Sequence, residues 1–145
     1  MIAVDPGVKG AMAYDVGNGP VATVWGGVDK MHDELTTALS VLLLQSKQPT
    51  VYLEHVTSSP IMSKKSAFTF GHNFGQWETL FYCFNVRVEL VKPQMWQRGI
   101  PGLAGKTGNV RKLALKAQAV RLFPQLRITK DNADALLILN YAQKQ

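Results

Sequence analysis

The spacing of apolar positions divides the chain into short strands and amphipathic helices. Apolar or alternating runs predict five strands, at Ile2–Asp5, Gly10–Asp15, Val21–Trp25, Thr50–Glu54 and Arg87–Val91. Apolar residues three and four positions apart predict helices beginning near Asp29, Ser66 and Val110, a short helix from Lys92, and a last helix over Lys130–Ala142. The strand–helix–strand order that ends at Thr50–Glu54 implies a right-handed crossover and parallel pairing with an earlier strand.

Two of these strands end on a carboxylate. Asp5 closes the first strand, and Pro6-Gly7 then forces a tight turn. Alone, Asp5 is most simply interpreted as a turn residue. Glu54 closes the fourth strand in the same way. If the two strands pair in parallel, the two carboxylates leave one sheet edge about 4.8 Å apart, which suits ligands that share a divalent ion.

A second pair of acids stands at the start of the last helix. Asp131 and Asp134 are three residues apart, so we expect them on one face of its first turn. Helix capping explains one of them, but it explains Asp134 less well because that residue falls among apolar positions. Four acids converging without counter-ions would repel one another strongly. A site of this kind therefore implies bound cations.

The positive charge of the chain is concentrated in one segment. The whole chain carries +6, but residues 87–130 hold ten basic residues against one acid, Glu89, for a local charge of +9. Nucleic acid is the polyanion that best explains this segment, and a merely soluble basic surface is the alternative. We expect DNA contacts from Lys64, Lys65, Lys92, Lys106, Arg111, Lys112 and Lys116. Lys112 and Lys116 are expected on the outward face of a helix whose inward stripe would be Leu113, Ala117 and Val120.

Composition narrows the class of protein. The chain of 145 residues, 46% hydrophobic and 18% charged, predicts one globular domain over residues 1–145. The longest apolar run, Val41–Leu44, is too short for a membrane span, and a single cysteine, Cys83, excludes an internal disulfide and is expected to be buried. We expect a cytoplasmic protein without a membrane partner.

Two glycine patterns invite interpretation. Gly105-Lys106-Thr107 resembles part of a phosphate loop, but Ile100 stands where that motif requires glycine, so no nucleotide cofactor is expected. Gly71 and Gly75 lie inside a predicted helix, where each costs about 1 kcal/mol relative to alanine. Such a pair indicates the close approach of another backbone, within the fold or in a dimer, or of a nucleic acid.

These motifs together resemble the RuvC Holliday junction resolvases of the RNase H-like superfamily. The resemblance rests on the strand ending in Asp5-Pro-Gly, the strand ending in Glu54, and Asp131-x-x-Asp134-Ala-Leu before the last helix. Ser66-Ala-Phe-Thr-Phe-Gly71 resembles the helix after the second acid. Val91-Lys-Pro-Gln and Arg121-Leu-Phe-Pro124 are more similar to the compact, phage-encoded branch.

The resemblance implies an α/β fold with an RNase H-like five-stranded mixed sheet flanked by helices. It further implies a homodimer that nicks four-way DNA junctions with two Mg²⁺ or Mn²⁺ ions and leaves 5′-phosphates. The catalytic and metal-binding acids would be Asp5, Glu54, Asp131 and Asp134, with Asp5 bridging both ions. The functional lysine would be Lys112 or Lys106, and we favour Lys112.

The chain also departs from the family pattern. The family places an aromatic wedge shortly after the second acid, where this chain has Thr57-Ser-Ser-Pro-Ile-Met62; Met62 or Phe68 are candidates for that role. Bacterial members carry a lysine where this chain has Trp96 and Gln97. Two alternatives to a strict resolvase therefore remain: a nuclease of the same fold with a broader range of branched DNA or other substrates, and a non-catalytic junction-binding protein.

Overall fold

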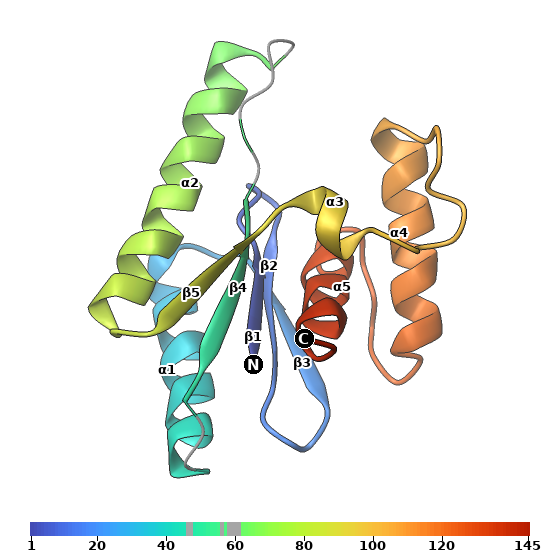
Figure 1. Cartoon of the computed structure of the whole chain (residues 1–145). Coiled ribbons are helices and arrows are strands. Elements are labelled where there is room, and N and C mark those ends of the chain that lie inside the picture. The colour runs from blue at the N-terminus through green and yellow to red at the C-terminus, as the bar shows by residue number, and fades with distance from the viewer. Residues whose placement is uncertain (46–47, 56, 58–61) are drawn as a thin grey trace.

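A five-stranded sheet forms the centre of the computed structural model, which describes residues 1–45, 48–55, 57 and 62–145 (Figure 1). Its strands are β1 (Ile2–Asp5), β2 (Ala11–Asp15), β3 (Pro20–Val24), β4 (Thr50–Glu54) and β5 (Arg87–Val91), in the order β3-β2-β1-β4-β5. The first three strands are antiparallel, whereas β1, β4 and β5 run parallel. The predicted mixed sheet is confirmed, and so is the parallel pairing of the fourth strand with an earlier one, which the structure shows to be the first.

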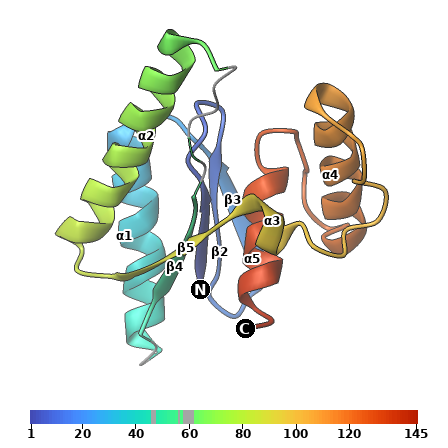
Figure 2. The same cartoon turned by 45° about the horizontal axis from the view of Figure 1, so that its top comes forward.

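Helices cover both faces of this sheet. They are α1 (Val28–Leu44), α2 (Lys64–Cys83), α3 (Pro93–Trp96), α4 (Gly108–Leu122) and α5 (Ala133–Ala142). Figures 1 and 2 show α1 and α2 on one face, α5 on the other, and α4 outside α5. The predicted elements are therefore present, with ends that differ by a few residues.

The two-residue period of β1 and β4 decides which way their terminal acids face. Ala3 belongs to the core formed with α5, and Tyr52 packs against that same core. Side chains two residues apart on a strand share a face, so Asp5 and Glu54 point to the α5 side. The strand alternation thus sends both carboxylates toward the helix that carries Asp134.

The buried face of α4 differs from the predicted one. Leu115 and Ala119 are buried, whereas Leu113 and Val120 are exposed. Basic and small apolar residues are interspersed around this helix, so its sequence contains more than one candidate stripe. Lys112 lies three residues before Leu115 and shares its side of the helix, so the prediction that Lys112 faces outward is wrong.

Three smaller expectations have different outcomes. None of the helices in the described part of the chain is long and apolar enough to cross a membrane. Cys83 is exposed at the end of α2, so its predicted burial is wrong. The segment 57–62, where the family would place its aromatic wedge, falls mostly on residues 58–61, which lie outside the described residues.

Candidate active site

Three buried carboxylates and one lysine meet where β1 and β4 end. Asp5, Glu54 and Asp134 come from β1, β4 and α5, and each is at most 7% exposed. Lys112 reaches them from α4: its Nζ donates a hydrogen bond to Oδ2 of Asp134 and lies 4.0 Å from Oδ2 of Asp5. The structure therefore brings together residues that are distant in sequence. We call the four acids, Asp5, Glu54, Asp131 and Asp134, the acid cluster.

The turn after β1 holds Asp5 in place through its backbone. The Gly7 N–H donates to Oδ1 of Asp5 at 2.9 Å, and the Gly10 N–H donates to the carbonyl of Gly7 at 2.8 Å. A Cβ at Gly10 would stand 2.0 Å from the carbonyl oxygen of Asp5, so only glycine fits there. The buried amide of Asn73, on α2, lies 3.5 Å from the Gly7 carbonyl. This turn leaves Oδ2 of Asp5 directed at Lys112.

Glu54 has a hydrogen-bond partner that could not be expected from the sequence. The indole N–H of Trp96 donates to Oε1 of Glu54 at 2.9 Å, and both side chains are buried. Trp96 ends α3, just after β5, where an apolar residue is ordinarily interpreted as core. No sequence motif marks an indole as the hydrogen-bond donor to an acid 42 positions away.

Asp131 lies outside α5, which begins at Ala133, so its predicted place in the first helical turn is wrong. The segment before the helix is shaped by its own side chains: the hydroxyl of Thr129 accepts from the N–H groups of Asp131 and Asn132, and Oδ1 of Asn132 accepts from the N–H of Thr129. Asp131 still belongs to the cluster electrostatically, since its charge is one of those that raise the pKa of Asp5.

The cluster is short of positive charge. Burial, and then the charges of Asp5 and Asp134, raise the pKa of Glu54 to about 8. Burial also raises the pKa of Asp5, although the nearby ammonium of Lys112 opposes the shift. Burial alone would lower the pKa of Lys112, but the attraction of Asp134 and Asp5 raises it instead. One lysine therefore stabilises only part of the negative charge that these acids carry when ionised.

The donor set fits a hard divalent cation. Within the described residues, no three His, Cys, Asp or Glu side chains stand grouped as the ligands of a metal ion, and Lys112 is the cation that contacts these acids. Oδ1 of Asp134 is nevertheless buried without a hydrogen-bond partner in the part of the chain that the structure describes. An unpartnered buried carboxylate oxygen beside other carboxylates suits Mg²⁺ or Mn²⁺, which prefer oxygen ligands.

Three of the residues expected to contact DNA, Lys92, Lys106 and Arg111, line two hollows at α3. A hollow of about 380 Å³ beside Glu54 is lined by His55, Thr57, Lys92, Pro93 and Gln94. A more open hollow of about 500 Å³ shares Gln94 and is lined further by Lys106 and Arg111. Gln94 lines both hollows, so they lie next to each other at α3, and we call the two together the basic groove.

The remaining predicted DNA contacts are on α2 and α4. Lys64 and Lys65 are exposed in the first turn of α2, and Lys116 is half-buried on α4. The starts of α2 and α4 lie at the same end of the molecule as the ends of β1 and β4 (Figure 1). Lys112 is the member of the predicted set that contacts the acids, whereas Lys106 lines the basic groove.

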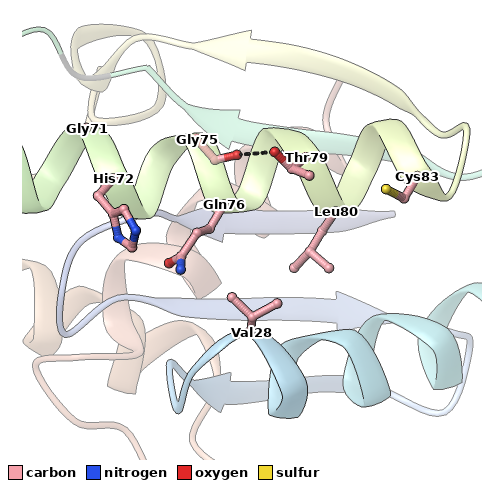
Figure 3. Close-up of a pocket in the computed structure, with 8 residues that line it drawn as sticks. All are labelled: Val28, Gly71, His72, Gly75, Gln76, Thr79, Leu80 and Cys83. Atoms are coloured by element: carbon pink, nitrogen blue, oxygen red, sulfur yellow. Dashed lines mark hydrogen bonds between the residues drawn. The ribbon is translucent and has the colours of Figure 1, made fainter.

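A separate, largely apolar groove of about 420 Å³ lies between α2 and the start of α1 (Figure 3). It is lined by Val28, Gly71, His72, Gly75, Gln76, Thr79, Leu80 and Cys83. A Cβ added at Gly71 or Gly75 would meet no atom of the described residues within 4 Å. The expected close packing of these glycines within the fold is therefore not found in the described structure.

Comparison with known proteins shows the class of fold. No protein-family model matches the sequence. No curated protein matches it either. The chain is similar over 99% of its length to the structure of Thermus thermophilus RuvC, with 96% of that chain covered, a TM-score of 0.58 and 16% identity. It is also similar over 99% of its length to T. thermophilus RuvC in complex with a Holliday junction substrate, with 95% of that chain covered, a TM-score of 0.57 and 14% identity.

These likenesses show an RNase H-like fold of the RuvC type, as the resemblance had implied. The predicted fold class is therefore confirmed by the comparison of structures, although the sequence comparisons found no match. The roles of the individual residues are not established by a likeness at such low identity, and they stand on the geometry of the acid cluster.

The raised pKa of Glu54 predicts a pH-dependent stability for the metal-free protein. A group whose folded pKa lies at about 8, above its ordinary value of 4.5, stabilises the fold below pH 4.5, and this stabilisation is lost as the pH rises through 8. We expect the free energy of unfolding, measured with chelator present, to fall by a few kcal/mol from pH 5 to pH 8, lowering Tm by roughly 10 °C.

Glu54→Gln should flatten this dependence, whereas Glu78→Gln, at an exposed position on α2, should keep it. The interpretation of the buried acid would be wrong if Glu54→Gln and the wild type lost the same stability over this range.

Proposed function

We propose that the protein is a metal-dependent endonuclease that resolves four-way DNA junctions by paired, symmetric nicks. The observation that carries the proposal is the meeting of Asp5, Glu54 and Asp134 around Lys112, at the strand ends of a RuvC-type fold. The basic groove beside Glu54 supports a phosphate backbone as the ligand. A protein that only binds junctions has no use for four converging acids.

The acids Asp5, Glu54, Asp131 and Asp134 would hold two Mg²⁺ or Mn²⁺ ions. When bound, such ions lower the pKa of an attacking water and stabilise charge on the leaving 3′ oxygen of a phosphodiester. Asp5 would contact a cation through Oδ2, because the Gly7 N–H engages Oδ1 and the turn leaves Oδ2 facing the cluster. The product would carry a 5′-phosphate.

Lys112 would have one role before cations bind and a different role after they have bound. In the structure its ammonium neutralises part of the charge on Asp134 and Asp5. Cations bound to the same carboxylates would weaken this ion pair, and the long side chain of Lys112 would then be free to contact the scissile phosphate. There its charge would stabilise the additional negative charge of the transition state.

The path of the DNA follows from the distribution of basic residues. The basic groove at α3 is lined by Lys92, next to the residue that follows Glu54, and further along by Lys106 and Arg111. Lys64 and Lys65 extend the basic surface to α2. Contacts of this kind recognise phosphates and so recognise the shape of the substrate, not its base sequence.

Removing the carboxylate charge at Asp5 should abolish cutting without abolishing binding. We expect Asp5→Asn to slow the Mg²⁺-dependent nicking of a synthetic four-way junction by roughly a thousand-fold, which corresponds to about 4 kcal/mol in the barrier. Junction affinity, measured by electrophoretic shift, should stay within a few-fold of wild type. Asp15→Asn is the matched control, because Asp15 ends β2 at the opposite end of the sheet, next to Met1.

The same assay distinguishes the possible activities. Symmetric nicks on opposite strands of the four-way junction support resolution, whereas equal cutting of three-way and flap substrates indicates a broader nuclease. Cleavage by Asp5→Asn at the wild-type rate would remove Asp5 from the reaction.

We further propose that two copies of the chain pair through the apolar groove on α2 (Figure 3). Paired nicks require two active sites, so a second copy of the chain is the partner that the activity demands. Gly71 and Gly75 each lower the stability of the helix. No atom of the described fold lies within 4 Å of where a Cβ would stand at either position, so packing within the fold does not require glycine there. The groove is lined mainly by apolar atoms, which suits a protein surface and not a phosphate backbone.

A side chain placed in this groove should weaken the dimer and leave the protomer folded. We expect Gly75→Leu to raise the dimer dissociation constant at least about tenfold, or ~1.4 kcal/mol, in analytical ultracentrifugation. Ala117→Leu is the control, because Ala117 is an exposed small residue on α4. A monomeric wild type, or a Gly75→Leu protein as dimeric as the wild type, would show that this groove is not the interface.

A further inference from the structure

Trp96 is the donor that the structure pairs with Glu54, and it comes from a rigid part of the fold. Its indole N–H lies 2.9 Å from Oε1 of Glu54, and Trp96 is 3% exposed. The indole belongs to the buried core that contains α5 residues such as Leu137. A side chain packed in this way has few alternative rotamers, so its hydrogen bond fixes the orientation of the carboxylate.

The backbone around Trp96 explains how the indole reaches Glu54. Glu54 pairs in register with Val91, and the His55 N–H donates to the Val91 carbonyl at 2.9 Å. Pro93 then begins α3, which turns the chain back so that Trp96 covers the end of β4. The donor is therefore attached to the strand that neighbours its acceptor.

We propose that Trp96 is a positioning residue that holds Glu54 as a one-oxygen ligand and so favours a small octahedral divalent ion over calcium. The hydrogen bond engages Oε1 and leaves Oε2 as the oxygen available to a cation. Mg²⁺ requires close to ideal octahedral geometry, whereas Ca²⁺ takes six to eight oxygens and often binds both oxygens of one carboxylate. The inference rests on the proposed function only in taking Glu54 as a metal ligand.

The chain offers a matched control for this hydrogen bond. Trp77 is fully buried in the other core, and its indole N–H has no hydrogen-bond partner among the described residues. Replacing either tryptophan by phenylalanine removes a similar volume from a buried site. Only Trp96→Phe removes a donor to a carboxylate.

The test is calorimetric titration of Mg²⁺, Mn²⁺ and Ca²⁺ into wild type, Trp96→Phe and Trp77→Phe, without DNA. Partners that orient metal ligands are typically worth 10- to 100-fold in metal affinity. We expect Trp96→Phe to bind Mg²⁺ and Mn²⁺ at least about tenfold more weakly while Ca²⁺ affinity changes little, so that the Mg²⁺/Ca²⁺ preference falls. Trp77→Phe should keep the wild-type preference.

The outcomes separate this inference from the proposed function. A wild type that binds no divalent ion overturns the nuclease site itself. A wild type that binds ions, with the same Mg²⁺/Ca²⁺ preference in Trp96→Phe, overturns only the role of Trp96. If Trp96→Phe does not fold, the wild-type indole ¹⁵N–¹H resonances give the answer: a Trp96 indole proton that stays downfield of the Trp77 indole proton at saturating Mg²⁺ supports the hydrogen bond to Glu54, and one that moves upfield to the Trp77 position overturns it.

Discussion

Repulsion among buried carboxylates is the constraint on which this site depends. Asp5, Glu54 and Asp134 are all nearly inaccessible to water, and burial is the largest cause of the raised pKa of Asp5 and of Glu54. In such surroundings ionised acids need cations close by. Among the described residues, the ammonium of Lys112 is the cation that contacts these acids, and one oxygen of Asp134 has no hydrogen-bond partner there. We therefore expect the folded site to favour the binding of added positive charge.

Only a few features of the fold are needed to bring these carboxylates together and orient them. Parallel pairing of β1 with β4 places two strand ends side by side, and the two-residue period turns both terminal acids toward α5. The turn at Gly10 and the indole of Trp96 then fix one oxygen of Asp5 and one of Glu54. Each of these acids thus has a backbone position and a hydrogen bond that restrict it, which is the preorganisation that electrostatic catalysis requires.

Much of this arrangement could be predicted from the sequence, because it follows from local patterns. A strand that ends on an acid before Pro6-Gly7 can be recognised directly in the sequence, and the crossover rule predicts that the strand of Glu54 runs parallel to an earlier strand, without saying which one. The side of α4 that faces the acids could not be predicted, because Lys112 and Leu115 compete with a second apolar stripe and only tertiary packing chooses between them. Trp96 was missed for a similar reason: an indole in a core has no sequence signal for its hydrogen-bond partner.

We propose that Asp5, Glu54 and Asp134 form a cation site that Lys112 partly neutralises in the metal-free protein. A crystal structure of the protein soaked in Mn²⁺, with anomalous diffraction recorded at the manganese edge, would show whether this is so. We expect an anomalous peak among these three carboxylates and a Lys112 ammonium that has moved away from Asp134. Crystals that show no peak there at saturating Mn²⁺, with Lys112 still bound to Asp134, would contradict it.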